Sequence, residues 1–365
     1  MGLASYGRPK YIETFRDMCR IEDEGAFTLN LDYFEFHRNA AYLGNEKQWV
    51  SKKFMALFGE PRVPESEVSE RDAEIAASLQ LRLNEVAMHL TQYLYRKSQC
   101  ANLCIAGGVG LNSVMNGHIF LNGPFEEIFI PPAANDAGNA VGAALHTYHF
   151  SLGHEREIWD NPYIFIGPEY SDQQIKAELD KRLSSYVRCE PAVTAAKLLA
   201  DGKILGWFQD RMEFGPRALG NRSILADPRD PKMKDHLNRR VKHREGFRPF
   251  APSVLQEKLG DFFASNYPSD VMLLVYDVLE EKRSEVPAIT HVDGTGRVQS
   301  VSSDDNPGFY RLITEFYKLT GIPMVLNTSF NVRGEPMVCT PADALNCFYA
   351  TGIDNLVIGN YLVSK

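Results

Sequence analysis

Residues 101–113 read ANLCIAGGVGLNS, a short apolar stretch that ends in closely spaced glycines. The apolar part predicts a buried strand, and Gly107, Gly108 and Gly110 predict a tight turn after it. Because glycine has no Cβ, such a turn lets the backbone approach a phosphate or a base closely. A plain strand-to-helix turn without a ligand is the alternative. The stretch therefore predicts an α/β element with a candidate nucleotide loop.

The alternation of strand and helix continues on both sides of this stretch. Residues 126–136, EEIFIPPAAND, predict a second short strand, and residues 137–150, AGNAVGAALHTYHF, predict a closely packed helix of small residues. Upstream, residues 71–98 carry apolar side chains at helical spacing and predict one long amphipathic helix. This alternation is typical of an α/β domain. The loops after the two strands are expected to face one cleft.

The second half of the chain also mixes helix and strand, with more strand character. Helices are predicted at residues 191–203 and 341–352, and strands at residues 204–209, 271–279 and 323–330.

Turn-forming and charged residues between 151 and 168 indicate a domain boundary. A chain of 365 residues is long enough for two domains. We therefore predict two domains, residues 1–155 and residues 156–365, of mixed α/β and α+β class.

The charge and hydropathy of the chain argue against nucleic-acid and membrane partners and for a local anion site. A net charge of −8 argues against a protein that binds nucleic acid with its whole surface. No apolar run approaches the ~20 residues that cross a bilayer, and the first residues do not read as a secretory signal. We therefore expect a cytoplasmic protein with no membrane contact. Residues 211–248, however, hold eleven basic and five acidic residues, which predicts a local anion site.

Residues 214–223, FGPRALGNRS, are the centre of that predicted site. Arg217 and Arg222 stand among glycines and a proline, which a merely solvated charged surface does not need. Guanidinium groups suit two-pronged contact with a phosphate or a carboxylate. The segment therefore predicts a phosphate-binding loop.

Two further segments add cations to this site. Residues 242–253, KHREGFRPFAPS, combine cations with aromatic residues and prolines, which predicts a rigid loop that holds Lys242 and Arg248 in place. A solvated basic turn is the alternative. Residues 291–299, HVDGTGRVQ, predict a hairpin, and its Arg297 can add a further cation to the pocket; an ordinary hairpin without a ligand is the alternative.

Polar residues follow two of the predicted strands. Asp136 follows a strand and opens a helix, so its carboxylate can bind a metal or orient a phosphate through one. Helix capping by Asn135 or Asp136 is the alternative. Residues 327–336, NTSFNVRGEP, offer amides and hydroxyls that can hydrogen-bond a nucleotide or an acyl amide.

Taken in order, seven motifs resemble the NodU/CmcH family of O-carbamoyltransferases. The motifs are GLASYGRP (2–9), AGGVGLNS (106–113), PPAANDAGNAVGAAL (131–145), FGPRALGNRSILADPR (214–229), KHREGFRPFAPSV (242–254), HVDGTGRVQSV (291–301) and LNTSFNVRGEPMV (326–338). The resemblance implies part of an actin-like (ASKHA) ATPase domain, followed by a YrdC-like α/β domain. It also implies that carbamoyl-adenylate is formed from carbamoyl phosphate and ATP, and that the carbamoyl group then moves to a hydroxyl of a small-molecule acceptor.

The resemblance assigns roles to individual residues. It implies four catalytic cations, namely Arg217, Lys242, Arg248 and Arg297. It implies contacts to ATP or to the adenylate from Gly107, Gly108, Asn112, Arg222, Ser253, Asn327 and Asn331. It implies Asp136 as a ligand of a divalent metal, iron or magnesium.

The chain departs from the family pattern at its start. Its first motif follows Met1 directly, whereas family members carry a histidine-rich metal motif and a first phosphate loop upstream. We therefore expect the transfer step to be incomplete in this chain alone, whether the chain is a fragment, has a mis-assigned start or pairs with a separate N-terminal half. Two other functions stay open: an RNA-binding module of the YrdC type, and a non-catalytic remnant that pairs with such a half.

Overall fold

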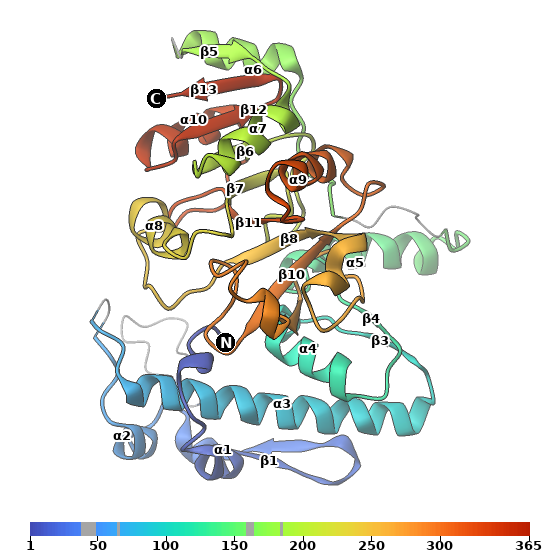
Figure 1. The fold of residues 1–365 in the computed structure, drawn as a ribbon. Helices are drawn as coiled ribbons and strands as arrows, with labels where there is room; N and C mark the ends of the chain where they lie inside the picture. The colour runs from blue at the N-terminus through green and yellow to red at the C-terminus, as the bar shows by residue number, and fades with distance from the viewer. Residues whose placement is uncertain (38–48, 64–65, 158–163, 183–184) are drawn as a thin grey trace. The chain divides into compact units, whose positions relative to one another are not determined.

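The computed structural model describes residues 1–37, 49–63, 66–157, 164–182 and 185–365 (Figure 1). These residues form two compact units, one of residues 1–103 and 114–128 and the other of residues 104–113 and 129–365. Residues 129–155 thus cluster with the second unit, while the assignment of 1–155 and 156–365 to two family domains stays a prediction. No helix in the described ranges is both long enough and apolar enough to cross a membrane.

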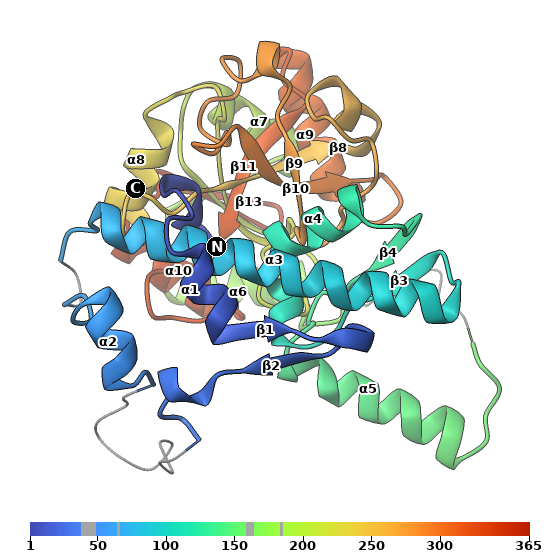
Figure 2. The same ribbon diagram turned by 90° about the horizontal axis from the view of Figure 1, so that it is seen from below.

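The first unit is organised around one long helix, α3 (Glu70–Ser98). A capping box between Ser69 and Asp72 begins this helix, and Gln99 in the left-handed conformation ends it. Figure 2 shows α1 and the β1–β2 ribbon running beside α3. The other elements wholly or mostly in this unit are α1 (Ile12–Met18), β1 (Cys19–Ile21), β2 (Phe27–Leu29), α2 (Lys52–Phe58), β3 (Asn102–Cys104), α4 (Ser113–Asn122) and β4 (Glu127–Phe129).

The second unit is built on a nine-stranded mixed sheet of order β5-β13-β12-β6-β7-β11-β8-β10-β9. The β6–β12 and β8–β10 pairs are parallel and the other neighbours are antiparallel. The strands are β5 (Tyr186–Arg188), β6 (Leu205–Phe208), β7 (Arg222–Ala226), β8 (Ala251–Leu255), β9 (Leu274–Asp277), β10 (Thr295–Val301), β11 (Met324–Ser329), β12 (Asn355–Ile358) and β13 (Tyr361–Ser364). The helices are α5 (Asn139–His146), α6 (Asp172–Lys181), α7 (Pro191–Ala200), α8 (Met233–Leu237), α9 (Pro307–Thr320) and α10 (Pro341–Ala350).

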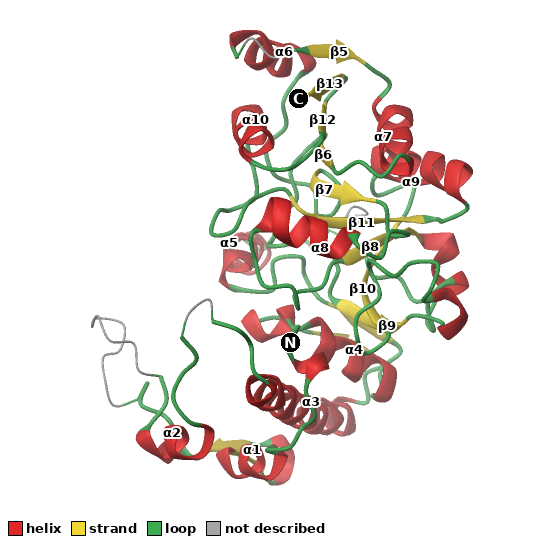
Figure 3. Ribbon diagram, turned by 60° about the vertical axis from the view of Figure 1, so that its left-hand side comes forward, coloured by secondary structure: helices red, strands yellow, loops and turns green. Residues whose placement is uncertain are grey.

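Helices cover both faces of this sheet, with α7 and α9 on one face and α10 on the other (Figure 3). Every residue of β6, β7 and β8 is buried, as expected for central strands between two helical layers. Helix α9 buries Phe309, Leu312, Ile313 and Phe316, which recur at the spacing of one helical face. This rigid core positions the loops described below.

The sequence-based elements are largely confirmed. The long helix predicted at 71–98 is α3, and the predicted helices and strands of the second half appear as α7, α10, β6, β9 and β11. Two packing predictions are wrong. Only Leu103 of β3 is buried, and no residue of α5 is buried although a closely packed helix was expected there. Small side chains permit close packing, but they do not by themselves supply enough apolar area to drive it.

Candidate functional site

The loop from Glu213 to Arg222 is shaped by one buried carboxylate. The Oε1 atom of Glu213 accepts hydrogen bonds from the backbone N–H groups of Leu219 at 2.8 Å, Asn221 at 2.7 Å and Arg222 at 3.0 Å. Glu213 is only 3% exposed, so these bonds are shielded from water. The FGPRALGN sequence is therefore wrapped around a carboxylate that the sequence analysis did not single out.

Arg222 makes its contacts inside the fold, while its predicted contact with a nucleotide stays a prediction. Its Nη1 and Nη2 atoms donate to four backbone carbonyls, those of Gln209, Asn221, Pro168 and Asp210. Its guanidinium also lies 3.7 Å from the centre of the Phe208 ring, and the residue is fully buried. Because both terminal nitrogens are used inside the fold, Arg222 ties loops together, and its Nε atom is buried without a partner among the described residues.

The same loop packs against the two loops that follow the short strands. A Cβ at Gly215, whose φ is 119°, would lie 2.5 Å from the carbonyl oxygen of Pro132, so only glycine allows this approach. Arg217 Nη2 lies 3.4 Å from the carbonyl oxygen of Leu111, at the end of the glycine turn. All three loops belong to the second unit. The segments 106–112, 131–139 and 214–217 are therefore adjacent in space.

A pocket of about 470 Å³ lies where these loops meet. Gly107 and Asp136 both line it, together with Phe214 and one side of α5. The N–H of Gly107 donates to the carbonyl of Ala134 at 2.7 Å, which fixes the two strand-end loops to each other. The prediction that these loops face one cleft is confirmed. Most of the lining is apolar, as is usual for small-molecule sites.

Two residues of the predicted nucleotide loop lie beside this pocket without lining it. Gly108 is exposed and begins a short 3₁₀ turn, Gly108–Leu111. Asn112 follows that turn, is half-buried, and its N–H donates to the carbonyl of Val109 at 2.9 Å. Of the three predicted residues, Gly107 alone lines the pocket.

Three arginines carry the positive charge of the site: Arg217, Arg244 and Arg297. All three are half-buried. Burial, followed by repulsion from Arg217 and Arg244, holds the pKa of Arg297 well below its usual range. Burial also lowers the pKa of Arg217. None of the three forms an ion pair with a carboxylate in the described part of the chain. Among the described residues Glu245 acts on Arg244 as a counter-charge, but no carboxylate acts in this way on Arg217 or Arg297, so these cations are arranged to receive an anion.

Arg244 is a cation that the sequence analysis did not name, and it lies close enough to the predicted Arg248 for the two charges to repel each other. Asn238 Oδ1 accepts from Arg244 Nε at 2.8 Å, and the guanidinium lies 4.8 Å from the centre of the Phe250 ring. Burial and the neighbouring Arg248 lower the pKa of Arg244 to about 10. Arg248 itself is exposed. A left-handed residue, His243 with φ 45°, redirects the chain here, which a cation count along the sequence does not reveal.

Lys242 holds a loop in place, while its predicted role as a catalytic cation stays a prediction. Its Nζ atom donates to the carbonyl and hydroxyl oxygens of Ser329, the latter at 3.3 Å. It also donates to the carbonyl oxygen of Asn331 at 3.0 Å and to its Oδ1 at 2.8 Å. The side chain is buried. Lys242 and the predicted ligand residue Asn331 thus bind each other, and together they fix the end of β11.

Ser253 and Asn327, also predicted as nucleotide contacts, form a buried polar network with Gln299. Asn327 Nδ2 donates to Ser253 Oγ at 2.9 Å, and Ser253 Oγ donates to Gln299 Oε1 at 2.6 Å. Gln299 Nε2 then donates to the carbonyl of Leu219 at 2.8 Å, and Asn327 Nδ2 lies 3.3 Å from the carbonyl of Ala218. The network therefore supports the loop behind Arg217.

Asp136 does not complete a metal site with the residues described. It is exposed at the edge of the 470 Å³ pocket. No group of three or more His, Cys, Asp or Glu side chains with metal-binding geometry occurs in the described ranges. A divalent cation such as Mg²⁺ takes about six oxygen ligands, and Asp136 supplies at most two.

Lys242 should make the stability of the protein depend on pH. Burial, together with Arg244 and Arg248, lowers its pKa from 10.5 to about 7. Between these two values the unfolded chain binds a proton that the folded chain has released, so the free energy of unfolding should rise with pH. Lys242→Met removes this contribution. In urea denaturation across this pH range, the variant should gain less stability than the wild type. Parallel pH profiles would instead mean that the four oxygen contacts keep the ammonium charged.

Comparison with known proteins gives the following matches. The model described as carbamoyltransferase N-terminus matches residues 1–145, and the model described as carbamoyltransferase C-terminus matches residues 196–365. An uncharacterised protein of Synechocystis sp. is 42% identical over all of this chain and 63% of its own length. Nodulation protein NolO of Bradyrhizobium diazoefficiens is 39% identical over all of this chain and 65% of its own length. Nodulation protein U of Rhizobium fredii is 39% identical over 64% of this chain and 38% of its own length. The chain thus spans less than two thirds of the length of these relatives.

Proposed function

Because this chain belongs to the carbamoyltransferase family, we propose that it forms carbamoyl-adenylate from carbamoyl phosphate and ATP and passes the carbamoyl group to a hydroxyl of a small-molecule acceptor. The finer assignment of the units, to an actin-like part and a YrdC-like part, belongs to the same proposal. We also propose that residues outside those described complete the transfer site. The same residues would complete a metal site that includes Asp136.

One observation carries this proposal: the half-buried cluster of Arg217, Arg244 and Arg297 without a paired carboxylate among the described residues. Like charges held together in a partly desolvated place repel each other. A triphosphate or an acyl phosphate brings the negative charge that relieves this repulsion, and guanidinium groups match its geometry. The cluster thus favours a phosphate-bearing substrate over a neutral one.

The adenylate-forming step balances with one water. Carbamoyl phosphate, ATP and water give carbamoyl-adenylate, phosphate and pyrophosphate. Water first releases phosphate from carbamoyl phosphate and leaves carbamate. A carbamate oxygen then attacks the α-phosphorus of ATP, and the bond to the β-phosphate oxygen breaks with its electron pair on pyrophosphate. Negative charge builds on the phosphoryl oxygens in the transition state. Arginines that are fixed beforehand stabilise that charge without reorganising.

The adjacent 470 Å³ pocket suits the nucleoside part of the adenylate. Its lining is largely apolar, and Gly107 leaves the backbone open to close approach. Phe214, which lines this pocket, is three residues from Arg217 in the same loop. A nucleotide can therefore place its base in the pocket and its phosphates toward the arginines. In the transfer step the acceptor oxygen attacks the carbamoyl carbon and AMP leaves.

The test is the release of pyrophosphate from ATP by the purified chain, with and without carbamoyl phosphate. We expect release that depends on carbamoyl phosphate, because the arginine cluster and its support lie within the described second unit. Acetyl phosphate in place of carbamoyl phosphate is the control for non-specific hydrolysis. Pyrophosphate release that is equal with and without carbamoyl phosphate would sink the proposal.

A further inference from the structure

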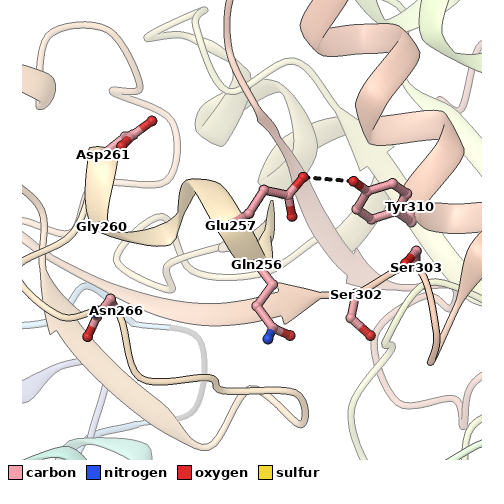
Figure 4. A pocket seen from close by; sticks show the side chains of 8 residues that line it. All are labelled: Gln256, Glu257, Gly260, Asp261, Asn266, Ser302, Ser303 and Tyr310. Atoms are coloured by element: carbon pink, nitrogen blue, oxygen red, sulfur yellow. Dashed lines mark hydrogen bonds between the residues drawn. The ribbon is translucent and has the colours of Figure 1, made fainter.

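A second pocket, of about 500 Å³, lies in the second unit and shares no lining residue with the site above. Three segments line it: the 3₁₀ turn Gln256–Asp261 after β8, Asn266, and the region from Ser302 to Tyr310. Figure 4 shows Glu257 and Tyr310 pointing toward each other across one side of this pocket. Its volume is in the range that holds a small ligand.

The residues that line this pocket are mostly polar, although the carbon atoms of their side chains form much of its surface. Apart from Gly260, every lining residue carries a hydrogen-bonding side chain. Tyr310 donates its hydroxyl hydrogen to Glu257 Oε1 at 2.7 Å, which orients that carboxylate and leaves its second oxygen as an acceptor. The amides of Gln256 and Asn266 form no hydrogen bond with other residues in the described ranges. Each amide offers two donor hydrogens and an acceptor oxygen.

The two serines of the pocket, which Figure 4 shows near Tyr310, are oriented as acceptors. Ser302 Oγ donates to Asp305 Oδ2 at 2.6 Å, and Ser303 Oγ donates to Asp304 Oδ1 at 3.2 Å. Ser302 Oγ also accepts from the N–H of Asp305 at 3.1 Å, so it keeps one lone pair for a ligand donor, while Ser303 Oγ keeps two. The pocket thus offers amide donors beside carboxylate and hydroxyl acceptors.

The composition of the lining excludes several ligand classes. No lysine, arginine or histidine lines the pocket, so a phosphate finds no counter-charge there. The lining has no aliphatic side chain, so it does not suit an acyl chain. The carboxylates of Glu257 and Asp261 make the lining negative, although Lys258 pairs with Asp261 at 3.1 Å. The absence of a three-ligand group in the described ranges argues against a metal ion.

We propose that this pocket binds a polyhydroxylated ligand of monosaccharide size, neutral or carrying an amino group. A sugar hydroxyl both donates and accepts, which matches the mixture of amides, carboxylates and hydroxyls in the lining. The negative carboxylates favour a protonated amine over a neutral hydroxyl at the same position and disfavour an acid. The proposal does not depend on carbamoyl chemistry, and it is tested without ATP or carbamoyl phosphate.

The test is saturation-transfer NMR and calorimetry on the full chain with glucosamine, glucose and glucuronate as probes. We expect binding in the order glucosamine, glucose, glucuronate. The double variant Gln256→Ala/Asn266→Ala should weaken glucosamine binding about tenfold, because it removes the amide contacts without breaking a bond inside the protein. Gln173→Ala, at an exposed amide on α6, is the matched control and should leave binding unchanged.

A third variant tests the charge separately from the shape. Glu257→Gln keeps an acceptor for Tyr310 but removes the negative charge, so it should reduce the preference for glucosamine over glucose while glucose still binds. Failure of all three sugars to bind would overturn the proposal. Wild-type affinity in the double variant would overturn it equally, because the sugar would then sit elsewhere.

Discussion

Replacing Arg297 by methionine should lower pyrophosphate release that depends on carbamoyl phosphate by about 100- to 1,000-fold, the usual effect of losing one fixed donor at a charged transition state. Arg297 stands on β10, where Val275 of the edge strand β9 pairs with it, so its guanidinium is attached to the sheet before any substrate arrives. Its Nε atom is buried without a partner in the described structure, and its neighbours Arg217 and Arg244 repel it. No carboxylate among the described residues pairs with this charge. We therefore expect Arg297 to stabilise the protein's complex with a phosphate-bearing substrate.

The same change should leave the folded protein as stable as the wild type, or more stable. Methionine has a similar length, removes a partly desolvated charge, and relieves repulsion with the two other arginines. A residue that holds the fold together would behave in the opposite way, because its loss would leave broken contacts. Loss of activity with unchanged or increased stability is therefore the signature of a ligand-binding cation.

The measurement combines the pyrophosphate assay with urea denaturation of both proteins in the absence of ligand. Arg239→Met, at an exposed arginine in the same basic segment, is the matched control and should change neither property. If Arg297→Met kept full activity, the arginine cluster would not be the substrate site. If it lost activity only together with its fold, Arg297 would have to be assigned a structural role.

The second unit illustrates which features a sequence can predict. Strands such as β6 and β11 are apolar runs bounded by glycine or proline, and their burial follows from hydrophobicity alone. The amphipathic helix α3 is equally clear because its spacing and its capping residues agree. The order of the nine strands is not visible in this way, because it depends on long-range pairing such as that of β7 with β11.

The sequence indicated the segments of the candidate site and some of its side chains: Arg217 and Arg297 were named from the sequence, whereas Arg244 was not. Every segment with an arginine or a glycine loop was found, because charge and glycine spacing are visible in sequence. The direction in which a side chain points is not visible in the sequence. Arg222 turns inward onto carbonyls while Arg217, five residues earlier, joins the cation cluster. Lys242 is buried against Ser329, 87 residues away. Such choices are made by tertiary contacts, and no local pattern encodes them.

Gln299 is a residue that supports the candidate site but could not be identified from the sequence. It stands in the motif that carries Arg297, yet a glutamine in a predicted strand carries no local signal for a role. The structure gives it a hydrogen bond to the carbonyl of Leu219 and a bond from Ser253. The residues that support a loop from behind are thus found only once the sheet has brought them together.

Glu213→Ala should destabilise the second unit by about 3 kcal/mol or more, since each buried donor left without a partner costs roughly 1–3 kcal/mol. The variant strands three backbone N–H groups, those of Leu219, Asn221 and Arg222, in a place without water. It also removes the carboxylate whose charge offsets that of the buried Arg222. Because the loop it shapes carries Arg217, pyrophosphate release should fall as well.

Two matched variants separate shape from charge in this effect. Glu213→Gln keeps an oxygen for the three N–H groups, and its amide nitrogen replaces Oε2, which has no hydrogen-bond partner among the described residues. Glu213→Gln should therefore lower the free energy of unfolding by less than Glu213→Ala does. It should also keep part of the pyrophosphate release, since only the charge is lost. Glu190→Ala, at an exposed ion pair with Arg311, should cost no more than about 1 kcal/mol. Urea denaturation of the three variants gives the order. Equal losses of stability for Glu213→Gln and Glu213→Ala would mean that the charge, and not the acceptor geometry, holds the loop. A loss of stability for Glu213→Ala no larger than that of the Glu190→Ala control would mean that the carboxylate does not organise the loop.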